Sequence, residues 1–229
     1  MDAVIMKFKK IFSTAKLSKR GLAIVSTVAV GLTTAQPVVA NEKTITLSKQ
    51  EFEQRVQASR LLVKEFAGNL QGTLKPALKG QGPVAAINVC NEVAPKLAQQ
   101  FEQQTGWRVG RTSLKARNPD NAPDAWESAV LNKLEQKKAQ NVAFSQLEYA
   151  EVVNFNGQPT LRYIKAIPTA QKPCLACHGS NIKPHVAAKI KMLYPQDKAT
   201  GYHEGDIRGA FTISQPLSSD WFKRNLASE

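Results

Sequence analysis

The chain contains one short segment whose residue types and spacing can do chemistry, Cys174-Leu175-Ala176-Cys177-His178. Two thiols separated by two residues can add to the two vinyl groups of one porphyrin, and the histidine directly after the second thiol is placed to ligate the iron. The chain has 229 residues and only three cysteines, so a chance match is a poor explanation. The spacing therefore predicts one covalently attached haem c, with Cys174 and Cys177 as attachment sites and His178 as an axial ligand.

The third cysteine, Cys90, leaves other interpretations of these residues open. Together with Cys174, Cys177 and His178 it would form a Cys₃His set, which is an acceptable zinc shell. The Cys-x-x-Cys pair alone is compatible with a redox disulfide, although a thioredoxin-type pair does not need the histidine. A disulfide framework is excluded because no independent pair of cysteines remains. From residue types alone, Cys90 is either an inert buried thiol on a helix face or the second axial ligand.

The first 40 residues have the layout of a secretory signal peptide. A basic segment precedes an apolar stretch from Gly21 to about Ala35, and small residues precede a cut after Ala40. The alternative is an uncleaved membrane anchor within residues 21–40, but the apolar run is short for a span, which needs about 20 residues. We therefore expect a cleaved signal peptide at 1–40 and a periplasmic, extracytoplasmic protein. Covalent haem attachment outside the cytoplasm agrees with this expectation.

The mature part, residues 41–229, has the length of a single domain of ordinary size. The whole chain carries 31 Lys and Arg against 18 Asp and Glu, a net charge of +13. Residues 1–40 hold six of these basic residues and one acid, so the mature part keeps 25 against 17, a net charge of +8. A basic surface of this kind suits nucleic acid, an anionic partner or a membrane surface. Export argues against nucleic acid, and no long Lys/Arg block follows the signal segment. We expect a solvated surface that assists docking to a redox or signalling protein.

The spacing of apolar residues predicts two helices before the first strand. Ser48-x-x-Glu51 is a capping box, and the helical period after it predicts a helix from residue 49 to about 74 or beyond. The Gly80-Gln81-Gly82-Pro83 segment should interrupt the chain. A second helix should follow and be kinked or interrupted at Pro95. Its apolar face consists of Ile87, Cys90, Ala94, Leu97 and Phe101.

The remaining chain predicts an antiparallel sheet flanked by helices, an α+β domain. Strands are expected at 107–114, 147–155, 160–167 and 207–214, and helices at 124–139 and 186–193. Asn156-Gly157 between two of these strands is a strong hairpin signal. The haem motif comes after the hairpin, on a predicted loop, whereas a small cytochrome c has its motif near the start of a mostly helical chain.

Distinctive short blocks are spread along nearly the whole mature chain. They include Val89-Cys90-Asn91, Ala94-Pro95, Gly106-Trp107, 110–114, Arg117-Asn118-Pro119, Asn121-Ala122-Pro123, Trp126-Glu127, 174–179, Tyr194-Pro195, Asp197, Ala199, Gly201-Tyr202 and 205–209. In this order they resemble a family of exported single-haem proteins with a PAS-like domain, found alone in cyanobacteria and as the extracytoplasmic part of bacterial signalling proteins. The resemblance implies a PAS-like sheet with flanking helices, a bound haem c, and His178 with the thiolate of Cys90 as the axial pair.

Three arginines, Arg111, Arg117 and Arg208, are candidate partners for the two haem propionates, because a guanidinium group matches a carboxylate bidentately. The alternative is a surface ion pair or a brace within a loop. No nucleophile–base–acid set and no phosphate-binding glycine motif is present in the sequence, and a peroxidase would need a distal acid–base set. We therefore do not expect an enzyme.

Five other side chains are of types that can bind a metal ion. His185, His203 and Met192 are alternative sixth ligands, but His185 is close in sequence to the motif, His203 should be exposed and Met192 should lie in the core. Asp120 and Asp124 match no dense acidic calcium loop, and turn and helix-cap roles are expected for them.

Two functions follow from these residues. The leading one is a redox or gas sensor, or a signalling accessory, in which reduction weakens the bond between iron and Cys90 and a small gas can then enter. The alternative is a periplasmic electron carrier that shuttles between redox partners. The long first helix also offers a face for a homodimer.

Overall fold

The computed structural model describes residues 47–218, and the predicted signal peptide at 1–40 lies outside them. A long helix, α2 (Lys49–Asn88), begins at the predicted capping box. The Ser48 side chain accepts from the Glu51 N–H, and the Glu51 carboxylate accepts from the Ser48 N–H, which satisfies two donors left free at a helix start. The predicted interruption is at Gly82, whose φ of 79° and ψ of −175° break the helix.

A single turn of π-helix follows α2 and carries Cys90. This turn, η1 (Val89–Val93), joins α2 to α3 (Ala94–Thr105). The N–H of Ala94 donates to the carbonyl of Val89, five residues earlier, and Pro95 has no N–H with which to continue the ladder. The predicted disturbance at Pro95 therefore takes the form of a widened turn immediately before the proline.

The four strands form one antiparallel sheet, as predicted. They are β1 (Arg108–Thr112), β2 (Glu148–Phe155), β3 (Gln158–Pro168) and β4 (Ile207–Pro216), in the order β1-β4-β3-β2. Asn156 and Gly157 join β2 to β3 with φ values of 54° and 78°, the left-handed conformations that a two-residue hairpin favours. The last strand, β4, pairs with both β1 and β3, so β1 forms one edge of the sheet.

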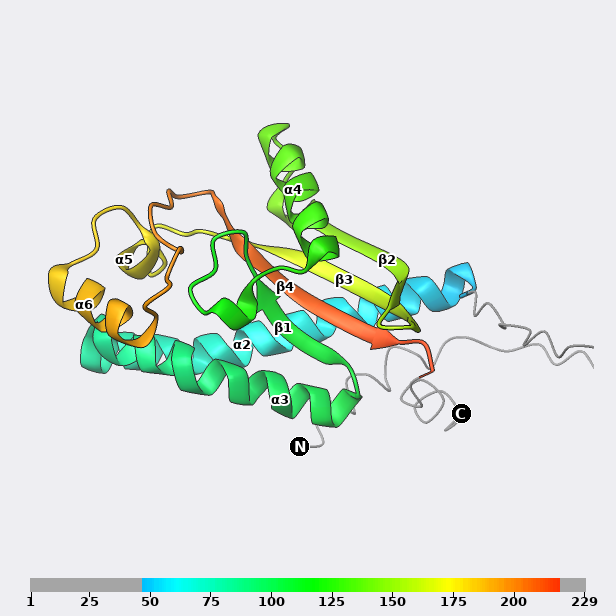
Figure 1. The fold of residues 1–229 in the computed structure, drawn as a ribbon, viewed down its shortest axis with the longest axis horizontal. Coiled ribbons are helices and arrows are strands. Elements are labelled where there is room, and N and C mark those ends of the chain that lie inside the picture. The colour runs from blue at the N-terminus through cyan, green and yellow to red at the C-terminus, as the bar shows by residue number, and fades with distance from the viewer. Residues whose placement is uncertain (1–46, 219–229) are drawn as a thin grey trace, which may run out of the picture. The chain divides into compact units, whose positions relative to one another are not determined.

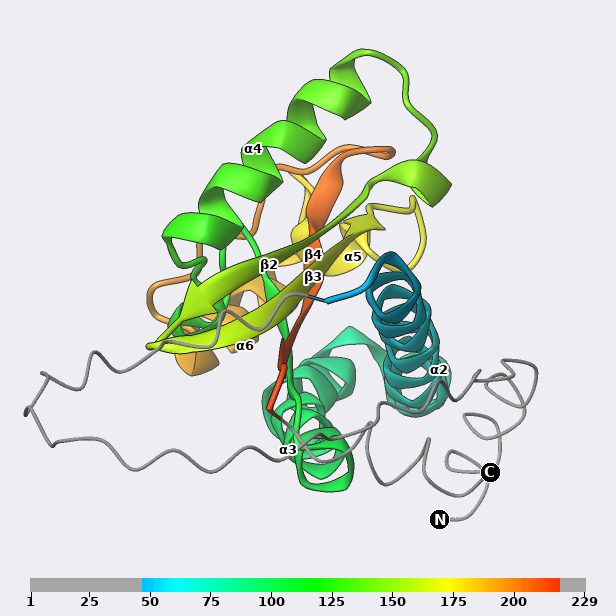
Figure 2. The same cartoon turned by 90° about the vertical axis from the view of Figure 1, so that its right-hand side faces the viewer.

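Helices cover both faces of this sheet, which confirms the α+β class. Helix α4 (Ala125–Ala139) covers one face, and α2 with α3 covers the other (Figure 1, Figure 2). On the α4 side the core contains Val130, Leu131, Leu134, Leu147 and Ile164. On the other side the Phe66 ring packs against Phe101 and Phe211, with centroids 5.9 and 5.7 Å away.

The Cys-x-x-Cys-His segment forms one helical turn, α5 (Leu175–His178), followed by α6 (Pro184–Leu193). The predicted loop at this segment is therefore wrong. The N–H groups of Cys177 and His178 donate to the Cys174 carbonyl at 3.2 and 2.9 Å, and such local bonds close a turn without any apolar period in the sequence. Both helices lie beside the C-terminal part of α2 (Figure 1).

Two 3₁₀ turns complete the described elements. The first, η2 (Pro119–Asn121), is in the segment between β1 and α4, and the second, η3 (Phe144–Gln146), precedes β2. Across residues 47–218, none of the helices has a stretch of sufficient length and apolar character to cross a bilayer.

Candidate functional site

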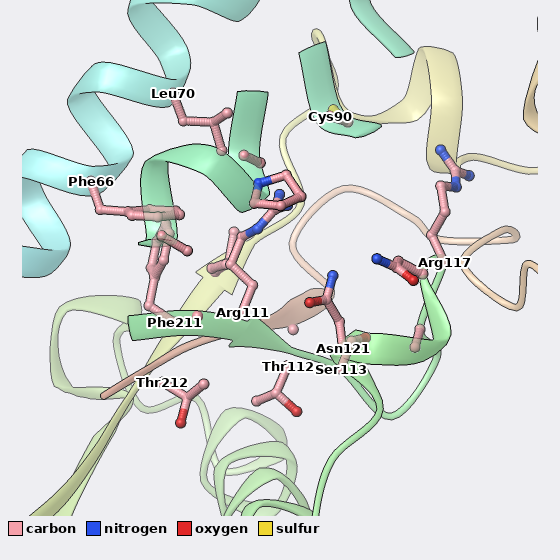
Figure 3. A pocket seen from close by; sticks show the side chains of 18 of the residues that line it. Phe66, Leu70, Cys90, Arg111, Thr112, Ser113, Arg117, Asn121, Phe211 and Thr212 are labelled. Carbon is pink, nitrogen blue, oxygen red and sulfur yellow. The ribbon is translucent and has the colours of Figure 1, made fainter. Parts of the chain in front are cut away.

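One cavity brings together Cys90, Cys177 and His178, which come from segments far apart in the sequence. Its volume is about 530 Å³, within the range of about 300–1,000 Å³ that cofactor sites have. Polar side chains of β1 and of the segment after it meet apolar ones from α2 and α3 at this space (Figure 3). The apolar wall includes Phe66, Leu70, Ile87, Ala94, Pro95 and Phe211.

His178 is held in one orientation and one protonation state. Its Nδ1 lies 2.8 Å from the carbonyl oxygen of Ala199, so Nδ1 carries the proton and donates, which leaves the lone pair on Nε2. Burial lowers the pKa of His178 well below its usual value, and the cations of Arg208 and Arg117 lower it further. The Tyr202 ring meets the imidazole edge-on, with centroids 6.3 Å apart. A neutral imidazole with Nδ1–H fixed to a carbonyl is the form that ligates a metal through Nε2.

A buried ion pair braces the backbone around this histidine. Arg117 Nη2 donates to Cys177 O at 2.6 Å, Asp197 Oδ2 at 3.1 Å and Ala199 O at 3.2 Å. Asp197 Oδ1 accepts from the Ala199 N–H at 2.8 Å. The Arg117 and Asp197 side chains are only 9% and 10% exposed. Because Ala199 O also accepts from His178, this pair holds both the second cysteine of the motif and the carbonyl that orients the imidazole.

Cys90 reaches the same cavity from the π-helical turn η1, and its side chain is half-buried. Figure 3 shows Cys90, Arg111 and Arg117 around one space. Burial lowers the pKa of Arg111, and the nearby Cys90 partly offsets this effect. Because Arg111 and Cys90 line the same cavity, a guanidinium group and a thiol face one space.

Arg111, Arg117 and Arg208 all line the cavity, as candidates for propionate binding should. Of the three, only Arg117 has a carboxylate partner among residues 47–218. Arg208 Nη1 donates to the Ser113 hydroxyl at 3.2 Å, and burial lowers the pKa of Arg208. The Nε atoms of Arg117 and Arg208 lack hydrogen-bond partners in the described part of the chain. Buried cations without counter-charges are unfavourable, so this set fits a ligand with anionic groups.

Cys174 lies one helical turn before Cys177 and outside the cavity wall, where it is half-buried. All three cysteines are free thiols. Within residues 47–218, no three side chains of His, Cys, Asp or Glu are arranged to hold a metal ion. The zinc shell that the residue types allow is therefore not assembled in this structure.

The alternative sixth ligands lie away from the cavity. His185 is exposed on α6, and His203 is exposed and lies 3.6 Å from Asp206. The expectation that Met192 lies in the core is wrong, because its side chain is 64% exposed. Helix α6 instead turns Val186 and Ile190 inward.

Asp120 and Asp124 have local roles in a turn and a helix cap, as expected. The Asp120 N–H donates to the Asn118 side chain within a turn, at 3.2 Å. Asp124 is the N-cap of α4 and forms a capping box with Glu127.

The model of the Tll0287-like protein family matches residues 33–216, which is most of the chain. The chain belongs to the Tll0287-like family. A solved structure titled "Crystal structure of the cyanobacterial heme-protein Tll0287" is 24% identical to it, with a TM-score of 0.52, and the match covers 75% of this chain and 98% of that one. No curated protein matches the chain. The structural likeness confirms the predicted PAS-like fold, a sheet flanked by helices with a long helix at the start.

Several residues that support this site have no role that the sequence alone predicts. Asp197, Ala199 and Tyr202 fix His178, and Ser113 accepts from Arg208. The role of Ala199 belongs to its backbone carbonyl, which no residue type reveals. Asp197 and Tyr202 stand in blocks that the family resemblance had already singled out, and this was the available signal.

Proposed function

We propose that this chain is an exported protein with one haem c, attached through Cys174 and Cys177 and ligated by His178 and Cys90, and that it acts as a redox or gas sensor or signalling accessory. The observation that carries the proposal is the meeting of Cys90, Cys177 and His178 at one cavity. The structurally similar cyanobacterial protein is titled a heme-protein, which supports haem as the ligand of this cavity.

The residues at the cavity fit haem in three respects. The imidazole of His178 is neutral, with its proton on Nδ1, so Nε2 is available to iron. Arg111 and Arg208 are cations without carboxylate partners in the described residues, which suits propionates. The wall contributed by α2 and α3 is largely apolar, as a porphyrin face requires.

The two proposed axial ligands differ in how firmly the chain holds them. His178 is fixed by the Ala199 carbonyl, which is itself held by Arg117 and Asp197. Cys90 is in a π-helical turn whose hydrogen-bond ladder is interrupted at Pro95. When bound, haem supplies one-electron redox chemistry and a site for small gases. The difference in support favours Cys90 as the ligand that leaves, which is the step that a ligand-switching sensor needs.

Covalent attachment is tested by the mass of the exported protein. We expect the intact chain to carry the mass of one haem after denaturation, and Cys174→Ser/Cys177→Ser to lose it. Glu53→Gln, a change at an exposed position of α2 outside the cavity, serves as a control and should keep the haem. Haem that is released from the wild-type chain by denaturant would contradict attachment. The same spectrum of masses tests export, because cleavage after Ala40 leaves a chain that begins at Asn41.

Carbon monoxide separates the sensor from the electron carrier. We expect the reduced wild-type protein to bind carbon monoxide, because reduction weakens the bond to Cys90 and opens a site on the iron. The oxidised protein serves only as a blank, since ferric haem binds carbon monoxide poorly with any axial ligand. If the reduced protein refuses carbon monoxide and cycles reversibly with both ligands in place, the electron-carrier alternative is supported instead. Either function requires a protein partner that exchanges electrons or a signal with the chain.

A further inference from the structure

The positive charge of the chain is unevenly distributed. Residues 66–91 and 152–196 contain no aspartate or glutamate. The C-terminal part of the first stretch meets the last part of the second, because α6 packs beside the end of α2 (Figure 1). The second stretch also contains α5, with both motif thiols. The exposed lysines of these segments are Lys75, Lys79, Lys172, Lys183 and Lys191, which we call the α5–α6 basic surface.

The packing of α6 explains why this surface faces solvent. Its inner face contributes Val186, Ile190 and the adjoining Tyr194 to a cluster with Ile87, against which Cys177 packs. The opposite side of α6 is left outside that cluster. Met192 is there, next to Lys191, and at 64% exposure it is the most exposed large hydrophobic side chain of residues 47–218.

The lysines of the α5–α6 basic surface are not neutralised by the fold. None of the five takes part in an ion pair within the described residues, whereas Lys138 and Lys165 elsewhere lie 3.5 and 3.4 Å from carboxylates. The next acid along the chain, Asp197, is 10% exposed and bound to Arg117. Lys75 and Lys79, four residues apart on α2, lie on the same helix face. Glu92, directly after the first stretch, is exposed on η1, so the surface beside the segment that holds the thiols is predominantly positive.

We propose that the α5–α6 basic surface docks an acidic face of a partner protein, with Met192, next to Lys191, as the apolar contact. The role of this docking rests on the proposed function, since a partner bound to the α5–α6 basic surface would lie next to the haem-bearing segment. Complementary charge steers such encounters and sets their orientation. A membrane surface is the less suitable occupant, because an interfacial helix needs a broad apolar face and this surface has one large apolar side chain that is exposed, Met192.

The test measures binding of the haem-loaded protein to an acidic probe, a plant-type ferredoxin, by titration calorimetry. The salt concentrations are about 10 mM and about 100 mM, where the screening length falls from about 30 to about 10 Å. The test variant is Lys79→Glu/Lys183→Glu/Lys191→Glu. Its control is Lys49→Glu/Lys64→Glu/Lys137→Glu, which makes the same charge change at exposed lysines of α2 and α4 outside the surface.

We expect binding at low salt that weakens at high salt, a loss of about tenfold or more in the test variant, and a loss of about twofold or less in the control. Equal losses in both variants would mean that only net charge matters, and no binding by the wild type at low salt would remove the surface as a docking site. Either result overturns the proposal. So does wild-type binding to phosphatidylserine–phosphatidylcholine vesicles in the absence of ferredoxin binding, because the partner is then a lipid headgroup. An absorption spectrum of each sample distinguishes failure of the proposed function from failure of docking. A missing haem spectrum contradicts the proposed function, whereas binding to ferredoxin can still be measured on the same sample.

Discussion

Replacing Arg117 with methionine should lower the free energy of unfolding by about 3–5 kcal/mol, because it leaves the buried carboxylate of Asp197 without its partner. Asp197→Asn should have a smaller effect, of about 2–3 kcal/mol, because Arg117 keeps the carbonyl oxygens of Cys177 and Ala199 as acceptors. Once either Arg117 or Asp197 has been replaced, replacing the other should lower the free energy of unfolding only a little further. A coupling energy of about 2 kcal/mol is therefore expected in the double-mutant cycle.

Urea unfolding of the two single variants, the double variant and the wild type measures this coupling. The matched control is a cycle on Lys138 and Asp206, which lie 3.5 Å apart with side chains 33% and 35% exposed. That exposed pair should couple by less than about 1 kcal/mol. If Arg117 and Asp197 couple no more strongly than Lys138 and Asp206, the reasoning that a buried pair braces the motif is refuted.

Two further predictions concern other parts of the fold. Burial raises the pKa of Glu148, but hydrogen bonds from Arg60 and Tyr163 outweigh this effect, so the pKa lies below its usual value in the folded protein. The ionised Glu148 therefore stabilises the fold fully above about pH 4.3, and this stabilisation is lost as the pH falls through the lower pKa of the folded state. Glu148→Gln should thus destabilise by about 1 kcal/mol at pH 7, with a smaller effect in urea unfolding below pH 4; an effect independent of pH would contradict this. At Gly179, an added Cβ would lie 2.7 Å from the Leu175 carbonyl, so Gly179→Ala should distort α5 and reduce haem incorporation relative to Gly72→Ala, where no atom lies within 4 Å. Equal incorporation in both variants would count against that close approach.

Elements with strong local signals were predicted correctly from the sequence. The capping box at Ser48, the left-handed Asn156-Gly157 turn and the N-cap at Asp124 each depend on residues within four positions of one another. Such signals act through short-range hydrogen bonds and backbone preferences, which tertiary packing does not override here.

Features that depend on hydrogen bonding or on distant packing were not predictable in this way. The π-helical turn at Cys90 arises from a bond between Ala94 and Val89 that apolar spacing does not encode. The exposure of Met192 follows from which face of α6 packs on α2, and this is decided by contacts between distant segments. Likewise, the residue types of Cys90 and His178 indicated chemistry, but only the fold places them at one cavity.

The most direct test of the account is the electron paramagnetic resonance spectrum of the oxidised, haem-loaded protein and its Cys90→Ala variant. We predict a low-spin ferric signal with thiolate character in the wild type, and its loss in Cys90→Ala. Met192→Ala, which changes an exposed residue outside the cavity, should keep the wild-type signal. An unchanged signal in Cys90→Ala would contradict the proposed axial pair and, with it, the ligand-switching function.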